Sequence, residues 1–515
     1  MNKEQILWAD DEIDLLKPHI LFLQNKGYEV TTVTNGRDAL DAISQQNFHL
    51  IILDENMPGI SGLEALQQIK IAQPNVPVIM ITKSEEENIM NQAIGSEIAD
   101  YLIKPVNPMQ ILLSIKKNLH SEALVAQKAT SDYQQEFMSI SQQIAMARTI
   151  DDWYQLYNTL VRWELTLSNA ETGMADMLRM QKQEANSAFA KMVKRNYEKW
   201  VTTDDHPLMS NEIFKTQIFP HIDAGEKVCF IVIDNFRLDQ WRTISPLLND
   251  YFNIEKEELY TTILPTATQY ARNAIFSGLM PIDIERMFPE LWVDEDEDEG
   301  KNLNEAPLIQ TILDRYRRKC KFSYNKLNDS AAGERLVQHF AQLKNFDLNV
   351  IVFNFVDILS HARTESKMIR ELAYTDEAYR SLTVTWFKNS YVLEIFKRIA
   401  EHGWKIVLTT DHGTTRVDNA IKVIGDKNTN TNLRYKVGKN LSYNPRQVYE
   451  IKQPKRFGLP LLNVSSTYIF ASGRDFFAYP NNYNHYVQYY NDTFQHGGIS
   501  MEEMLVPLIT LTPKK

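Results

Sequence analysis

The sequence contains little cysteine and no long apolar run. Only two cysteines, Cys229 and Cys320, occur in 515 residues, which excludes a disulfide framework and any CxxC-type metal site. No uninterrupted apolar stretch approaches the roughly 18 residues of a membrane-spanning helix. The first residues contain acids and no apolar core, so they do not resemble a signal peptide. We therefore expect a cytoplasmic protein without a membrane span.

Positive charge is in the minority. Lys and Arg total 55 against 66 Asp and Glu, a net charge of −11, which argues against a general nucleic-acid coat protein. The chain also lacks a basic stripe, a recognition-helix signal and a zinc-finger pattern, so a DNA-binding regulator is disfavoured. Its length suggests about three domains, and 43% hydrophobic residues are enough to fill several cores.

Proline is absent between Pro108 and Pro207, where Gly173 is the only glycine. Apolar residues recur there with helical spacing, most clearly from Trp153 to Trp163. The pattern predicts a helical bundle over residues 121–204, serving as a spacer or for dimerisation.

The two flanking regions alternate apolar runs with amphipathic segments, which is typical of parallel α/β sheets. Residues 1–120 predict a flavodoxin-like (βα)5 domain and residues 205–515 a second, larger α/β/α domain. The expected strands are 5–9, 28–33, 49–53, 76–81 and 100–103 in the first region. In the second they are 227–233, 259–264, 349–356, 405–410 and 466–471.

Charged and hydroxyl residues follow the strands of the first region. Asp10 and Asp11 follow the first strand, Asp54 ends the third, Thr82 the fourth and Lys104 the fifth. In a parallel sheet these side chains emerge at one edge, where three carboxylates would hold a hard cation such as Mg²⁺. One carboxylate can then accept a phosphoryl group, which Lys104 and Thr82 would bind.

This region resembles the response-regulator receiver domain over about 120 residues. The matching motifs are WADDE at 8–12, LDENMPG at 53–59, IT at 81–82 and KP at 104–105. The resemblance implies that Asp54 is the phosphoacceptor and that Asp10, Asp11 and the Asn56 carbonyl bind Mg²⁺. It also implies that Tyr101 changes position together with the Thr82 hydroxyl when the domain switches.

The second region contains residues typical of metal ligands near its strand ends: Asp234, Asp357, His361, the tripeptide DHG at 411–413 and His496. An Asp and a His four residues apart can bind one ion if a helix begins there. Gly413 permits the turn that brings Asp411 and His412 together. Three Asp and three His suit Zn²⁺, with Mn²⁺ as an alternative, and predict a dinuclear hydrolytic site.

A hydroxyl nucleophile is expected between residues 264 and 273, at a strand-to-helix turn with two threonines. Arg272 lies one helical turn beyond Thr268 and is predicted to contact a non-bridging phosphate oxygen. A threonine here can also be a helix N-cap, and both roles are compatible.

The second region resembles the alkaline phosphatase superfamily, specifically its PglZ branch. The resemblance rests on the motif PTAT at 265–268 followed by SG at 277–278, which is similar to the nucleophile turn of nucleotide pyrophosphatases and phosphodiesterases. It implies Thr268, not Thr266, as nucleophile. The implied ligands are Asp234, Thr268, Asp411 and His412 for one zinc, and Asp357, His361 and His496 for the other. The resemblance departs at 269–272, so Asn273 is not assigned as oxyanion donor.

A receiver, a helical segment and a PglZ-type domain in this order resemble the PorX-type response regulators, which are associated with type IX secretion. The resemblance implies a zinc-dependent phosphodiesterase acting on nucleotides or oligonucleotides. It also implies phosphorylation by a sensor histidine kinase, homodimerisation, and contact with a sigma factor or the secretion machinery.

Three further expectations follow from the sequence. An oligonucleotide would need local positive charge, for which Arg237, Arg272 and Arg416 are the candidates. The acidic run at 294–299 is expected to be a solvated loop. The alternative function is a signalling scaffold in which the second domain binds a partner and its chemistry is vestigial or that of a monoesterase.

Overall fold

The computed structural model describes residues 3–83, 87–168, 172–293, 303–425, 429–463 and 465–514, so the acidic run at 294–299 lies outside the described residues. The chain forms two compact units, Met1–Ser131 and Asp132–Lys515. Among the residues that the structure describes, no helix combines the length and the apolar character needed to cross a bilayer.

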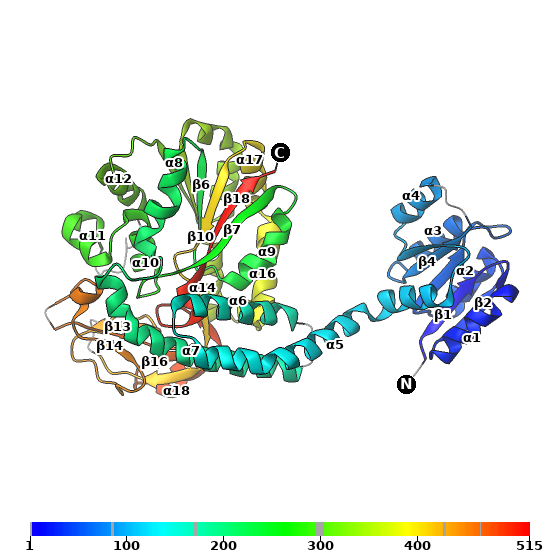
Figure 1. The fold of residues 1–515 in the computed structure, drawn as a ribbon, viewed down its shortest axis with the longest axis horizontal. Coiled ribbons are helices and arrows are strands. Elements are labelled where there is room, and N and C mark those ends of the chain that lie inside the picture. The colour runs from blue at the N-terminus through cyan, green and yellow to red at the C-terminus, as the bar shows by residue number, and fades with distance from the viewer. Residues whose placement is uncertain are drawn as a thin grey trace. The chain divides into compact units, whose positions relative to one another are not determined.

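The first unit contains a parallel five-stranded sheet in the order β2-β1-β3-β4-β5, as a flavodoxin-like (βα)5 domain requires (Figure 1). The strands are β1 (Gln5–Ala9), β2 (Glu29–Val33), β3 (Leu50–Asp54), β4 (Val78–Thr82) and β5 (Asp100–Ile103). The helices are α1 (Lys17–Asn25), α2 (Gly36–Gln45), α3 (Gly62–Ala72), α4 (Glu87–Gly95) and α5 (Pro108–Met146). Each predicted strand is found to within two residues.

The buried central strands explain why helices cover both faces of this sheet. In β1, Leu7 packs in a cluster with residues of α2 and α3, while its neighbour Trp8 packs in another with residues of α1 and α5. Successive side chains of a strand point to opposite faces, so a fully apolar strand needs cover on both sides.

The helical segment consists of the C-terminal part of α5, α6 (Ile150–Thr166) and α7 (Thr172–Thr202). Its core is aromatic: Trp163 contacts Tyr133, and Trp153 contacts Phe189, with ring centroids 5.2 and 5.5 Å apart. These helices belong to the second unit together with the C-terminal domain.

The C-terminal domain contains a six-stranded sheet in the order β7-β18-β10-β6-β9-β8. Its strands are β6 (Val228–Ile233), β7 (Phe252–Thr261), β8 (Phe322–Leu327), β9 (Leu348–Phe353), β10 (Lys405–Thr409) and β18 (Leu505–Pro513). Strands β10, β6, β9 and β8 are parallel, and β18 is antiparallel to both neighbours. Helices α8, α10 and α12 lie on one side of the sheet and α9, α16 and α17 on the other, which makes the domain α/β/α (Figure 1).

The helices of this domain follow in chain order. They are α8 (Phe219–Asp223), α9 (Leu238–Ile244), α10 (Thr268–Ser277), α11 (Pro281–Met287), α12 (Glu305–Arg315), α13 (Ser330–Gln338), α14 (Phe355–Glu365), α15 (Lys367–Leu372), α16 (Asp376–Asn389), α17 (Tyr391–Glu401), α18 (Tyr483–Tyr490) and α19 (Met501–Met504).

Small sheets complete the domain. Strand β11 (Thr415–Val417) pairs with β17 (Thr493–Gln495), and β12 (Asn419–Lys422) pairs with β16 (Asp475–Ala478). Strand β15 (Thr467–Phe470) lies between β13 (Tyr435–Gly438) and β14 (Tyr449–Ile451).

The predicted strands of this domain differ from the structure in three places. Strand β7 begins and ends earlier than the predicted 259–264, and the predicted 349–356 runs into α14, which begins at Phe355. The segment predicted at 466–471 forms β15, which belongs to a small sheet and not to the main one.

Candidate functional site

The receiver domain brings its acids together at the carboxyl edge of the sheet. Ligand oxygens of Asp10, Asp11 and Asp54 lie within 4.8 Å of one another. The Lys104 ammonium lies 2.8 Å from Asp10 Oδ2 and 3.1 Å from Asp54 Oδ2. Among the described residues, no group donates a hydrogen bond to the buried Asp54 Oδ1. A buried, unsatisfied carboxylate oxygen beside two further acids fits a hard cation such as Mg²⁺.

Burial raises the pKa of Asp54, and the nearby charge of Lys104 partly offsets this effect. For Lys104 itself, burial alone would lower the pKa, but the hydrogen bond to Asp10 and the two carboxylate charges outweigh it and raise the pKa. Thr82 is fully buried at the end of β4, Tyr101 is half-buried on β5, and Asn56 is exposed in the loop after β3.

The C-terminal domain forms two groups of metal-type ligands. Asp234, Asp411 and His412 form one, and Asp357, His361 and His496 form the other, each with ligand atoms within 4.8 Å. The groups adjoin, since the rings of His412 and His496 stack with centroids 4.2 Å apart. The structure thus brings together all six of the predicted Asp and His residues.

The sheet explains how residues distant in the sequence meet here. Strands β6, β9 and β10 are parallel, so Asp234 and Asp411 emerge beyond the same edge as Asp357, which lies in the first turn of α14. His361 follows one turn later on α14, and its side chain is 60% exposed. His496 reaches the site from the β11–β17 pair.

Thr268 lies at the first position of α10, and its hydroxyl is 3.1 Å from His412 Nε2 and 3.5 Å from Asp234 Oδ1. The N-cap of this helix is Ala267, so Thr268 is not needed as the cap. Thr266 is fully buried, where its hydroxyl donates to the Gly498 carbonyl and accepts from the Gly497 amide. Geometry therefore favours Thr268 over Thr266 as the hydroxyl available to a substrate.

Backbone carbonyls fix the rings of the fully buried His412 and of His496, which is 13% exposed. His412 Nδ1 lies 3.1 Å from the Gly413 carbonyl, and His496 Nδ1 lies 3.1 Å from the Thr266 carbonyl. Such contacts select the tautomer that leaves Nε2 as a metal ligand. Burial lowers the pKa of His412 to about 4 and that of His496 to about 3, so both are neutral at pH 7.

Burial also acts on the carboxylates. It raises the pKa of Asp234, although the charge of Arg272 opposes it, and it raises the pKa of Asp357, with the charge of Asp234 adding to the effect. Neutral histidines beside carboxylates whose charge is unfavourable without a cation are a set that fits Zn²⁺.

Arg272 does not lie where the sequence predicted. Its side chain has no exposed surface, so it cannot contact a substrate phosphate. Its Nε donates to Asp411 Oδ2 at 3.0 Å, Nη1 donates to Glu305 Oε1 at 3.2 Å, and Nη2 pairs with Asp234. The guanidinium therefore lies on the buried side of Asp234 and Asp411 and pairs with their carboxylates. Arg272 is thus a positioning residue, and Asn273 is likewise buried.

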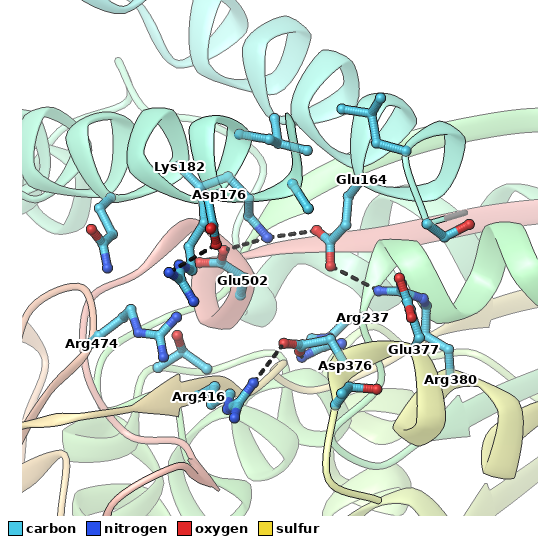
Figure 2. Close-up of a pocket in the computed structure, with 18 of the residues that line it drawn as sticks. Glu164, Asp176, Lys182, Arg237, Asp376, Glu377, Arg380, Arg416, Arg474 and Glu502 are labelled. Carbon is cyan, nitrogen blue, oxygen red and sulfur yellow. Dashed lines mark hydrogen bonds and ion pairs between the residues drawn. The ribbon is translucent and has the colours of Figure 1, made fainter. Parts of the chain in front are cut away.

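The other two predicted cations are also engaged elsewhere. Arg237 is bidentate to Asp239, and Arg416 lies 3.1 Å from Asp492. Both line a separate cavity between the helical segment and the C-terminal domain (Figure 2).

The sequence reasoning missed Asn235. Its backbone amide lies 3.4 Å from Asp411 Oδ1, and its side-chain amide donates to Asp357 Oδ1 at 3.1 Å. It has φ of 62°, the left-handed region that asparagine tolerates better than most residues. The Asp-Asn pair after a buried strand was the available signal, and Asn235 links the two ligand groups.

Family models match three successive parts of the chain. Residues 6–116 match the response regulator receiver domain, and residues 123–201 match the PorX response regulator linker domain. Residues 213–511, more than half of the chain, match the BREX system PglZ alkaline phosphatase-like domain. The chain belongs to the PglZ family. The predicted order of receiver, linker and PglZ domains is confirmed, and the PglZ domain contains both ligand groups.

Two transcriptional regulatory proteins are similar to part of the chain. ResD of Bacillus subtilis, a transcriptional regulatory protein, is 32% identical over 115 residues, which are 22% of this chain and 48% of ResD. PhoP of the same organism, the alkaline phosphatase synthesis transcriptional regulatory protein, is 29% identical over 168 residues, which are 32% of this chain and 68% of PhoP. The chain thus spans about half of ResD and two thirds of PhoP.

Solved receiver structures are also similar. A CheY-like receiver domain protein from Methanospirillum hungatei is 28% identical, with a TM-score of 0.23, and the match covers 23% of this chain and 96% of that one. CheY4 of Vibrio cholerae is 28% identical, with a TM-score of 0.22, covering 23% and 100%.

Proposed function

We propose that the chain is a two-component response regulator whose PglZ domain is a zinc-dependent phosphodiesterase controlled by phosphorylation of Asp54. The position of Thr268 carries this proposal. Its hydroxyl lies at the N-terminus of α10, within 3.5 Å of two residues of one ligand group, and the second group adjoins.

The ligand groups would hold two zinc ions, with the predicted ligand sets unchanged. These are Asp234, Thr268, Asp411 and His412 for one ion, and Asp357, His361 and His496 for the other. When bound, zinc would lower the pKa of the Thr268 hydroxyl and neutralise charge on a phosphate.

Each residue of the site would have a distinct role in the reaction. The Thr268 oxygen, after losing its proton, would bond to phosphorus as the bond from phosphorus to the leaving ester oxygen breaks and that oxygen departs as an alcohol. Water would then hydrolyse the phosphothreonine and restore the Thr268 hydroxyl, and the N-terminus of α10 would favour the phosphate anion. Arg272 would hold the carboxylates of Asp234 and Asp411, and Asn235 that of Asp357. The substrate class we propose is nucleotide or oligonucleotide phosphodiesters. Since Arg237 and Arg416 pair elsewhere, the substrate charge would be met by the metals and the helix terminus.

In the receiver, Asp10, Asp11, Asp54 and the Asn56 carbonyl would bind Mg²⁺, and Asp54 would accept a phosphoryl group from a sensor histidine kinase. Lys104, 3.1 Å from Asp54, would neutralise the new charge. Thr82 and Tyr101 would then carry the switch, as the receiver resemblance implies.

The match to the PorX linker supports a wider proposal. Phosphorylation would produce a homodimer, and the protein would contact a sigma factor and the type IX secretion machinery. The dimer is tested by measuring the mass in solution with and without beryllofluoride, and a mass that stays monomeric would refute it.

The activity is tested with bis-p-nitrophenyl phosphate, before and after chelation and with zinc restored. We expect zinc-dependent turnover that Thr268→Val abolishes and Thr268→Ser partly retains, because serine keeps a hydroxyl. Turnover unchanged by Thr268→Val would refute the nucleophile. Hydrolysis of p-nitrophenyl phosphate alone would indicate a monoesterase, and no turnover with zinc bound would favour the scaffold.

A further inference from the structure

The helical segment and the PglZ domain meet around a charged cavity of about 270 Å³, which we term the seam (Figure 2). Helices α6 and α7 supply Glu164 and Lys182, and the PglZ domain supplies Arg237, Arg380 and Glu502. These residues are not needed to fill an apolar core. Two series of contacts, one from Glu164 and one from Lys182, connect the helical segment to the loops of His412 and His496.

The first chain of contacts begins at Glu164. Its carboxylate lies 2.8 Å from Arg380, which lies 3.2 Å from Asp239. Asp239 receives two hydrogen bonds from Arg237, at 2.9 and 2.7 Å. Three of these four side chains are at most 5% exposed, and Glu164 is 17% exposed.

Arg237 is the last residue in this series of contacts, and it packs against the segments that contain the proposed ligands His412 and His496. It lies three residues after Asp234, and its guanidinium carbon is 5.2 Å from the ring centroid of Phe494, two residues before His496. A Cβ placed on Gly413, which follows His412, would lie 3.4 Å from Arg237 Cγ.

The second chain begins at Lys182 and reaches the same place. Its ammonium lies 2.6 Å from Glu164 and 3.2 Å from Glu502. Asn186, one turn later on α7, donates to Glu502 and accepts from the Met501 amide. The Glu502 carbonyl lies so close to Gly413 that a Cβ there would be 2.0 Å away.

We propose that Glu164 and Lys182 are positioning residues through which the helical segment holds the loops of His412 and His496, and so regulates metal binding in the PglZ domain. This inference rests on the proposed function, because it assigns a control to the same metal centre. Both series of contacts run through side chains that are at most 19% exposed, so a displacement of α6 or α7 changes contacts at Gly413 and Phe494 without an intervening flexible loop.

Lys182→Met tests this while leaving a folded protein. The methionine keeps most of the buried stem, Glu164 retains Arg380, and Glu502 retains Asn186. Lys182→Arg is the conservative rescue. Lys199→Met is the matched control, because Lys199 lies on the same helix, is 54% exposed and pairs only with Asp205 among the described residues.

Zinc affinity is measured for each variant by competition with a chelator, and hydrogen exchange is measured on metal-free protein for peptides covering 410–416 and 495–503. We expect Lys182→Met to weaken zinc binding roughly 2- to 30-fold and to accelerate exchange in both peptides. Lys182→Arg and Lys199→Met should stay close to the wild type.

Wild-type affinity and exchange in Lys182→Met would overturn the inference. If the wild type binds no zinc, the proposed function fails. In that case the hydrogen-exchange data alone decide whether Glu164 and Lys182 hold the two loops.

Discussion

Replacing Arg272 with methionine should make the stability of the PglZ domain depend more strongly on zinc than it does in the wild type. The guanidinium is fully buried and pairs with Asp234, Asp411 and Glu305. Burial alone would lower its pKa, but the three carboxylate charges raise it well above the ordinary value, so Arg272 is always charged. Methionine keeps the aliphatic part of the side chain and removes only the charge and the donors.

The magnitude follows from the cost of a buried charge left without its partner, about 3–5 kcal/mol. Glu305 retains Lys326 at 3.1 Å and the Tyr324 hydroxyl, so the loss falls mainly on Asp234 and Asp411. These two carboxylates are the ones that bound zinc would neutralise. At roughly 2 °C per kcal/mol for a large domain, the metal-free variant should melt about 6–10 °C below the wild type.

Calorimetry in chelator and in zinc measures both states. Zinc should recover a large part of the deficit, so the gain in Tm on adding zinc should be greater in Arg272→Met than in the wild type. Arg318→Met is the control: its pair with Asp223 is 36% and 45% exposed and should contribute at most about 1 kcal/mol. A metal-free Arg272→Met protein that melts with the wild type, or a deficit that zinc leaves unchanged, would refute the reasoning.

Three further predictions concern other parts of the chain. Lys104→Met removes the cation that offsets the burial of Asp54, so the pKa of Asp54 should rise further, and the pH midpoint of its labelling by acetyl phosphate should move upward; an unchanged midpoint would contradict this. The pKa of His496 is about 3 when folded, below about 6.5 when unfolded, so the unfolded chain binds the proton first and metal-free stability falls as the pH drops below about 6.5. His496→Asn should therefore lose about 2 kcal/mol less than the wild type between pH 7 and 5 in urea titrations, and equal losses would exclude this cause. Gly333→Ala places a Cβ 2.2 Å from a tyrosine ring and should destabilise by about 1–3 kcal/mol, whereas Gly173→Ala meets nothing within 4 Å and should be neutral or slightly stabilising.

The receiver could be predicted almost completely from the sequence, because its strands are short, buried and separated by clear turns. The larger sheet could not. Strand β18 contains Pro507 and Pro513, which argue against a central strand. Pro507 lies outside the residues of β18 that pair with β10, 508–511, and is opposite Leu259 in the pairing with β7. Strand β7 is rich in charge because it lies at an edge of the sheet, and its first residues therefore lacked an apolar signal.

The candidate ligand residues could be identified because metal chemistry restricts residue type and because parallel strands place their carboxyl ends at one edge of a sheet. The role of Arg272 could not, since spacing on a helix gives the direction of a side chain and not its depth. A guanidinium one turn beyond Thr268 fits a phosphate contact equally well until Glu305, 33 residues away in the chain, is known to pair with it.

The helical segment shows a different limit. An amphipathic stripe predicts that the apolar face of a helix is buried. The polar face is then expected to contact solvent. Glu164 and Lys182 lie outside the aromatic core, yet they are largely buried because the PglZ domain supplies Arg380 and Glu502, more than 200 residues away. No sequence pattern predicts which oppositely charged residues pair when they are so far apart in the chain. Buried ion pairs often stabilise no more than apolar residues of similar volume, so we infer that these pairs serve to fix one docked arrangement of the helical segment and the PglZ domain. A segment held in one arrangement against the loops of His412 and His496 transmits a displacement to them, which the spacer or dimerisation bundle expected from the sequence would not need to do.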